Sequence, residues 1–257
     1  MFDAVRAHAA AVGLTERVGV RPAGSPADAA ARRWVTRALR RAGWSTTEDP
    51  VVLPQGGATA NVVAWLGSER PTGPHIVVGA HLDTVADSPG ANDNATGIGV
   101  IVALARELAD EHLTVPLVLV AFGAEEYQPT DPREHHLGSA AYAAEHADHV
   151  LAMISVDMVG NGEVTCICWY DAGSDDLALY LGGIAARLGA GYEVRAAGDI
   201  SDHGPFALHN VPAAFLWTGD DGRYHTLEDT AEHLRVGDIA RAGDLVLAFA
   251  RAPAPPR

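Results

Sequence analysis

Three short and almost wholly apolar runs, each followed closely by a histidine or an acidic residue, constrain most strongly how this chain can fold. They cover residues 75–80, 116–122 and 150–156. Because they lack a polar face, we expect them to be strands buried on both sides, as in a parallel sheet. Apolar residues at helical spacing predict helices at residues 27–42, 98–108, 137–146, 174–188 and 236–250.

Strands that alternate with helices favour an α/β fold in which a largely parallel sheet forms in one domain. Further strands are expected at residues 51–53, 60–66, 163–170 and 213–217. With 257 residues the chain can bury a sizeable core, and no repeat or linker divides it. We therefore predict one domain over residues 1–251, followed by an extended or disordered Pro/Ala-rich tail at residues 252–257.

Charge and composition exclude several classes of function. The formal net charge of -15 argues against nucleic acid, because a phosphate backbone needs a positive partner. All 18 basic residues are arginines, so lysine Schiff-base chemistry and a Walker A lysine are excluded. No stretch is apolar enough for a membrane span, and the N-terminus lacks the pattern of a signal peptide. We expect neither a nucleic acid nor a membrane as a partner.

The two cysteines bear on the cellular compartment. Cys166 and Cys168 lie two positions apart in an expected strand, so both point to one face. That spacing is unfavourable for a mutual disulfide, and two thiolates alone cannot complete a zinc cage. Buried free thiols are therefore expected, and they favour a reducing compartment such as the cytoplasm.

Residues that can bind a metal ion follow the apolar strands directly. His81 follows the first, Glu125 and Glu126 come shortly after the second, and Asp157 follows the third. The carboxyl ends of parallel strands meet at one edge of a sheet, where functional loops gather. Imidazole and carboxylate groups are ligands that zinc prefers. Each residue alone is compatible with a plain surface turn, but the ordered set favours a metal site.

Three further segments extend this set. Asp93 lies in a loop of small residues, where the backbone can approach a metal closely, and a carboxylate there can bridge two ions. Asp83 is placed to fix the second ring nitrogen of His81. Neighbouring side chains such as Glu125 and Glu126 point in different directions, so one can bind metal while the other takes a proton from water. Together these residues predict a two-metal hydrolase.

The motifs taken together resemble one family. The sequence resembles the co-catalytic zinc aminopeptidases of the bacterial leucyl aminopeptidase and Streptomyces aminopeptidase type, from about Arg21 to about Thr230. The motifs that carry the resemblance are His81-x-Asp83, Gly90-Ala91-Asn92-Asp93-Asn94-Ala95-Thr96-Gly97, Gly123-Ala124-Glu125-Glu126, Asp157-Met158-Val159-Gly160, Ser201-Asp202-His203 and Tyr224-His225-Thr226.

The resemblance implies a role for each motif residue. Asp93 would bridge two Zn²⁺ ions, with His81 and Asp157 completing the first site. Glu126 and His225 would complete the second site. Glu125 would be the general base, and Tyr224 would help to stabilise the tetrahedral intermediate. Met158 would line the first side-chain pocket. Glu125 and Asp157 would also hold the substrate's ammonium group.

The resemblance also implies a fold and a reaction. The fold would be a single-domain, three-layer zinc-exopeptidase fold, with a mostly parallel mixed sheet of about eight strands and helices on both faces. The reaction would be metalloprotease hydrolysis of the N-terminal peptide bond, preferentially after an apolar residue, in a peptide or aminoacyl amide. The oligomeric state stays open.

Two segments depart from the family pattern or match it weakly. Residues 127–136 form an insertion that can reshape specificity, bind a partner or be a plain surface loop. Within it, His135 and His136 are expected to be exposed to solvent, because the ligand set is already complete. Ser201-Asp202-His203 is expected either behind the metal ligands or as a helix cap.

Three other functions stay open at this point. A glutaminyl cyclase resembles this family but uses one zinc ion. A tailoring hydrolase would act on one peptide-like metabolite or on a non-peptide amide, which would suit the insertion. A binding module without catalysis is disfavoured, because every ligand position and the general base are filled.

Overall fold

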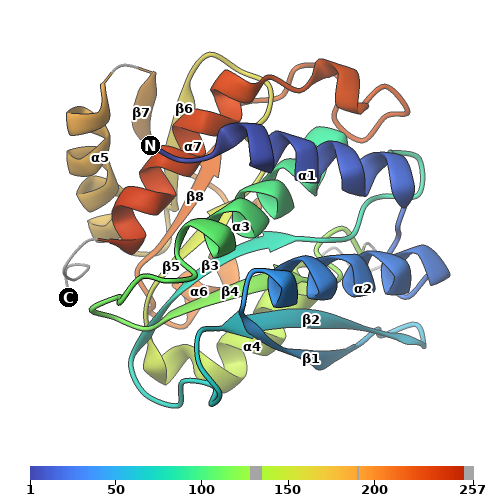
Figure 1. The fold of residues 1–257 in the computed structure, drawn as a ribbon, viewed down its shortest axis with the longest axis horizontal. Coiled ribbons are helices and arrows are strands. Elements are labelled where there is room, and N and C mark those ends of the chain that lie inside the picture. Colours follow the sequence, from blue (N-terminus) through green and yellow to red (C-terminus); the bar gives the residue numbers. More distant parts are fainter. Residues whose placement is uncertain (128–134, 190, 252–257) are drawn as a thin grey trace.

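The computed structural model describes residues 1–127, 135–189 and 191–251, so the predicted tail lies outside the described residues. Eight strands form one sheet in the order β1-β2-β4-β3-β5-β8-β6-β7, with helices on both faces (Figure 1). This confirms the predicted α/β fold with a mixed sheet. The strands are β1 Ser45–Val52, β2 Ala58–Trp65, β3 His75–His81, β4 Leu117–Phe122, β5 Val150–Val156, β6 Thr165–Tyr170, β7 Tyr192–Ala197 and β8 Ala213–Trp217.

The centre of the sheet is parallel. Strand β3 pairs in parallel with β4 and β5, and β5 pairs in parallel with β8. Antiparallel pairs join β1 to β2, β2 to β4 and β6 to β8, and β7 pairs in parallel with β6 at the far edge. The four central strands therefore bring their carboxyl ends to one edge of the sheet.

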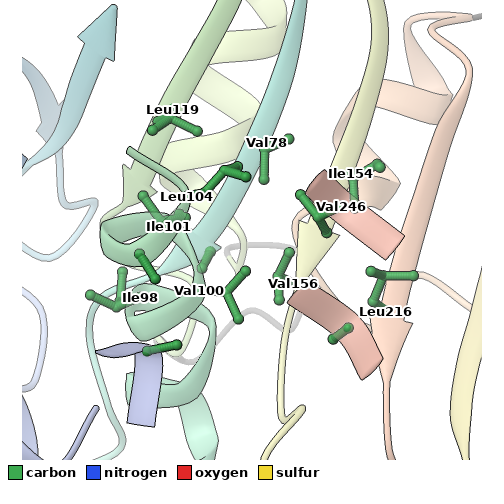
Figure 2. Close-up of a cluster of buried hydrophobic side chains, with 14 of the residues drawn as sticks. Val78, Ile98, Val100, Ile101, Leu104, Leu119, Ile154, Val156, Leu216 and Val246 are labelled. Atoms are coloured by element: carbon green, nitrogen blue, oxygen red, sulfur yellow. The ribbon is translucent and has the colours of Figure 1, made fainter. Parts of the chain in front are cut away.

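Side chains of the central strands alternate between two apolar layers. Ile76 and Val78 of β3 pack into the larger layer, whereas Val77 points into the smaller one. In Figure 2, Val78 and Leu119 lie beside Leu104 of helix α3 (Thr96–Glu107), whereas Ile154 and Leu216 lie on the side of Val246 of helix α7 (Val236–Ala250). The helices are α1 Ala4–Arg17, α2 Pro26–Arg41, α3 Thr96–Glu107, α4 Leu137–His146, α5 Asp176–Leu188, α6 His203–Leu208 and α7 Val236–Ala250.

Local signals set where several helices begin and how closely they pack. The hydroxyl of Ser25 accepts a hydrogen bond from the backbone of Asp28, and Pro26 occupies the first turn, as the N-cap pattern of α2 predicts. Helix α3 lies against α1 so closely that a Cβ on Gly99 would be 2.3 Å from the carbonyl oxygen of Ala7. Among the described helices, none combines the length and the apolar character that crossing a membrane requires.

Three elements have no counterpart in the sequence-based prediction. Helix α1 buries mainly alanines, which give a weak apolar signal. Strand β7 is largely exposed at the edge of the sheet, so it lacks the apolar alternation of a half-buried strand. Helix α6 has six residues, too few for a helical period to be recognised.

The expectation of free thiols is wrong. Cys166 and Cys168 form a disulfide within β6. Both side chains point to one face of the strand, and their Cα atoms are 5.7 Å apart, inside the range that a disulfide spans. The argument for a reducing compartment that rested on free thiols therefore loses its support, and a cytoplasmic location stays a prediction.

Candidate metal centre and active site

The predicted metal ligands meet at the carboxyl edge of the central strands. His81 ends β3, Asp157 directly follows β5, and Asp93 precedes α3. The Nε2 atom of His81 lies 3.0 Å from Oδ1 of Asp93 and 3.3 Å from Oδ1 of Asp157. These three side chains are buried and form the first candidate group of ligands.

A second group shares the carboxylate of Asp93. The Nε2 atom of His225 lies 2.8 Å from Oε1 of Glu126 and 3.4 Å from Oδ2 of Asp93. The two oxygens of Asp93 thus face different histidines, one in each group. This is the arrangement that a carboxylate bridging two metal ions requires.

The spacing and charge of both groups fit divalent cations. Bonds of about 2.0 Å in tetrahedral geometry place two zinc ligands about 3.3 Å apart, close to the distances found here. Burial and the nearby charge of Asp93 raise the pKa of Glu126 well above its usual value, and burial also raises the pKa of Asp157. Oδ1 of Asp157 is buried yet accepts no hydrogen bond from the described residues. A metal ion would neutralise this buried negative charge and bind that oxygen.

Asp83 joins the ends of two strands rather than bonding His81 through its carboxylate. Nδ1 of His81 lies 3.2 Å from the backbone oxygen of Asp83 but 3.9 Å from its carboxylate. The carboxylate instead accepts hydrogen bonds from the backbone N–H groups of Glu125 and Glu126, at 3.0 and 3.1 Å. Asp83 therefore fixes the ring nitrogen of His81 with its carbonyl and the Glu125-Glu126 pair with its side chain.

The loop that presents Asp93 is held from two sides. Oδ1 of Asn92 accepts a hydrogen bond from the backbone of Gly160, just beyond Asp157. The carboxylate of Asp229 accepts hydrogen bonds from the backbone N–H groups of Asn92 and Asp93, at 2.7 and 3.0 Å. Sequence reasoning missed Asp229, although it lies only four residues after His225. A buried anion at this point fixes the backbone that carries the shared ligand.

Arg21 also supports the loop that carries Asp93. Its guanidinium is completely buried and donates hydrogen bonds to the backbone carbonyls of Gly19, Leu82, Pro89 and Gly90, at 2.6–3.0 Å. Burial lowers its pKa to about 10, despite the nearby carboxylates of Asp83 and Asp93. No sequence pattern predicts this role, because Arg21 lies outside any helical or strand periodicity.

Replacing Arg21 with methionine is expected to lower the free energy of unfolding by about 3 kcal/mol or more, because four backbone carbonyls, two of them buried, would lose their donors. Urea unfolding monitored by circular dichroism measures the change. Arg37→Met at an exposed position of α2 is the matched control and should change stability by less than about 0.5 kcal/mol. Equal stability of the two variants would contradict the anchoring role.

Unusual backbone conformations surround the candidate site. Five described residues other than glycine have a left-handed φ, and four of them border the site: Ala124, His136, Met158 and His225 have φ values between 50° and 59°. Such residues persist only where the surrounding structure holds them, and they gather at functional sites. The fold therefore holds these segments in place against their local preference.

A cavity of about 280 Å³ opens next to the ligands. Met158 lines it, as the resemblance implies, together with Ile200, Phe215 and Trp217. Tyr224 also lines it and stacks on His225, with ring centroids 3.6 Å apart. Burial and the surrounding carboxylates raise the pKa of Tyr224 above its usual value, so its hydroxyl keeps a proton to donate.

The prediction that His136 is exposed is wrong. Its side chain is buried, and Nε2 lies 2.9 Å from Oε1 of Glu125. The chain returns from the insertion beside the strand end that carries Glu125, so the imidazole enters the interior. His135 is only half-buried and touches the ring of His136. Most of the insertion, residues 128–134, lies outside the described residues.

Ser201 hydrogen-bonds to one of the candidate metal ligands, Asp157. Its hydroxyl donates a hydrogen bond to Oδ2 of Asp157 at 2.9 Å and lies 3.0 Å from the hydroxyl of Ser155. Asp202 precedes helix α6 but makes no side-chain capping bond. Of the two interpretations of Ser201-Asp202-His203, the geometry favours the one in which the segment lies behind the metal ligands.

Solved structures of similar fold include a hydrolase and a cyclase. The crystal structure of BSAP, a zinc aminopeptidase from Bacillus subtilis, matches with a TM-score of 0.84 and 19% identity, covering 96% of this chain and 94% of that one. A glutaminyl cyclase from an Acidobacteriales bacterium matches with a TM-score of 0.84 and 21% identity, covering 97% and 95%. At these identities the likeness shows the fold alone.

Sequence comparison assigns the family. The chain is 32% identical over 187 residues to aminopeptidase YwaD of Bacillus subtilis, which covers 67% of this chain and 40% of that protein. The match thus spans less than half of the relative's length. The model of peptidase family M28 matches residues 61–250, which include every predicted metal ligand. The chain therefore belongs to peptidase family M28, which confirms the metallo-aminopeptidase resemblance of its motifs.

Proposed function

We propose that this protein is a two-zinc aminopeptidase that removes an N-terminal residue, preferentially apolar, from peptides. The observation that carries the proposal is the carboxylate of Asp93, whose two oxygens face His81 in one ligand group and His225 in the other. The family and the aminopeptidase relatives support the same reaction class.

Different residues of the candidate site would carry out different parts of the hydrolysis. His81, Asp157, Glu126 and His225 would hold the ions on either side of Asp93. Bound zinc supplies Lewis acidity, which polarises the scissile carbonyl and makes a nearby water molecule easier to deprotonate. The side chains of this chain must then move protons and hold the substrate.

Glu125 is suited to proton transfer. Burial alone would raise the pKa of its carboxyl, but positive charge at the ligand group that contains His81 and on His136 outweighs burial and lowers it. The carboxylate is therefore ionised, lines the cavity and can take a proton from the attacking water. It can later return this proton to the leaving amine. Tyr224 can donate a hydrogen bond to the carbonyl oxygen as negative charge develops there.

The cavity favours a substrate with a free amino terminus and an apolar side chain. The carboxylates of Glu125 and Asp157 lie on its wall, where they can bind a substrate ammonium group. Met158, Phe215 and Trp217 provide an apolar surface for the adjoining side chain. An exopeptidase needs both features next to the same scissile bond.

A glutaminyl cyclase is the second candidate function, since such an enzyme shares this fold. Cyclisation of an N-terminal glutamine with one zinc ion needs one ligand group, whereas this site offers two groups that share Asp93. A tailoring hydrolase with one dedicated substrate would keep both groups. These alternatives differ in metal number and substrate.

The proposal is tested by counting zinc per chain and assaying leucine and other aminoacyl chromogenic amides with and without a chelator. We expect about two zinc ions and amine release that the chelator abolishes and added zinc restores. Leucine and phenylalanine amides should exceed glutamate amides in kcat/KM. One ion with conversion of a glutamine-initiated peptide would indicate the cyclase, and two ions with no release would indicate a dedicated substrate.

A further inference from the structure

His136 is joined to the segment of Glu125 through its backbone. It directly precedes helix α4, and its N–H donates a hydrogen bond to the carbonyl oxygen of Glu125 at 3.2 Å. The next residue, Leu137, donates in the same way to Ala124 at 2.9 Å. These two backbone hydrogen bonds thus fix the backbone of His136 next to the backbone of Glu125.

Both ring nitrogens of His136 face carboxylates. Nε2 lies 2.9 Å from Oε1 of Glu125, and Nδ1 lies 3.4 Å from Oδ1 of Asp199. Burial opposes a positive charge on the ring, but Glu125 and Asp199 outweigh burial and raise the pKa of His136 to about 10. A doubly protonated ring places positive charge beside both carboxylates, which favours the observed ring orientation.

The two neighbouring glutamates differ in what can hold them. Glu126 belongs to a candidate ligand group and faces His225, so a metal ion would fix it. Glu125 must stay free of metal to accept a proton. The rate of proton transfer falls if its long, flexible side chain is displaced by as little as about 1 Å. His136 contacts one oxygen of Glu125, Oε1, and can therefore orient this carboxylate while its other oxygen stays available for the proton.

We propose that His136 is a positioning residue that holds Glu125 in the orientation for proton transfer, and that Asp199 holds the imidazole from its other side. This inference rests on the proposed function, in which Glu125 is the general base. Glu125, His136 and Asp199 lie outside the two ligand groups that share Asp93, so replacing His136 or Asp199 should leave those two groups intact.

A surface cavity gives access to His136 from the side away from the metal ligands. It has a volume of about 350 Å³, and its lining includes His135, His136, Asp199 and His209. Removing the imidazole of His136 would extend this cavity toward Glu125. A small molecule such as free imidazole could then enter and restore the contact.

The experiment compares His136→Gly and His136→Asn with the wild-type holoenzyme on leucine amide. Both residues tolerate the left-handed φ of 54°, so the backbone can keep its conformation. We expect kcat to fall about 10- to 100-fold, with KM and zinc content unchanged. Imidazole should restore part of kcat in His136→Gly, corrected for its effect on the wild type. His209→Ala, an exposed histidine on the same cavity, is the control and should keep wild-type kcat.

Asp199→Asn should give a smaller fall in kcat, because Nε2 of His136 would still face Glu125. An unchanged kcat in both His136 variants, or a fall that imidazole does not relieve, would overturn the inference. So would a loss of kcat that merely follows zinc loss.

A second readout does not depend on turnover. In the wild-type holoenzyme, the His136 ring followed by nitrogen NMR should stay protonated at pH 8, and Glu125→Gln should lower its pKa. A His136 pKa that Glu125→Gln leaves unchanged would overturn the contact. If the wild type releases no amine from any aminoacyl amide, the proposed function fails, and this measurement still decides whether His136 holds Glu125.

Discussion

Glu125→Gln is expected to lower kcat by about 10³-fold while both zinc ions stay bound. The amide has nearly the shape of the carboxylate but cannot take a proton from water. Glu125 lies in neither group that shares Asp93, so its replacement removes no ligand of those groups. The backbone N–H of residue 125 can still donate to Asp83, because the substitution changes only the side chain.

Steady-state kinetics on leucine amide and zinc analysis of the same preparation test this prediction. Glu145→Gln on the exposed side of α4 is the matched control and should keep wild-type kcat and zinc content. A Glu125→Gln enzyme with a near wild-type rate would refute the assignment of the general base. Loss of zinc in that variant would instead make Glu125 a ligand.

Asp93→Ala is expected to abolish binding of both zinc ions and to lower activity at least about 10⁴-fold, since the two-metal chemistry would be lost. Each oxygen of Asp93 faces a different histidine, so one substitution removes a ligand from both groups. His225→Ala removes a ligand from only one group and should leave about one ion bound. This contrast distinguishes a shared carboxylate from two independent sites.

Zinc content after dialysis, together with thermal unfolding, separates ligand loss from unfolding in Asp93→Ala. Asp87→Ala, an exposed acid of the connection that precedes the Asp93 loop, is the control and should keep both ions. Retention of two ions by folded Asp93→Ala would show that this carboxylate does not bridge them. Loss of one ion would leave Asp93 as a ligand of a single site.

Where apolar periodicity is strong, the sequence predicted the elements closely. Helix α4, strands β5 and β8 and helix α7 begin and end where the pattern places them. The first predicted strand, residues 51–53, covered only the apolar end of β1. Its other residues include Glu48, Asp49 and Pro50, which are uncommon in strands and interrupt the apolar pattern. An edge strand tolerates such residues, and a local pattern cannot distinguish an edge strand from a loop.

The assembly of the candidate ligands was also predictable, for a topological reason. His81 and Asp157 lie at the ends of apolar runs, and parallel neighbours bring such ends together. The contacts that hold them were not predictable. Asp229 bonds the backbone of Asn92 across 137 positions, and Arg21 reaches Gly90 across 69. No local pattern carries such pairs.

The amino-acid sequence alone specifies which residues end the buried strands, because a strand buried on both faces is an apolar run that can be recognised without knowing its neighbours. These runs thereby specify the fold class and place His81 and Asp157 at one edge of the sheet. Which polar side chains are buried, in contrast, depends on contacts that form only in the folded chain. His136 is hydrophilic and follows an insertion, so its sequence context predicts exposure, yet the chain folds it against Glu125. Burial of a polar group depends on a distant partner of complementary charge, and only the folded chain brings the two together.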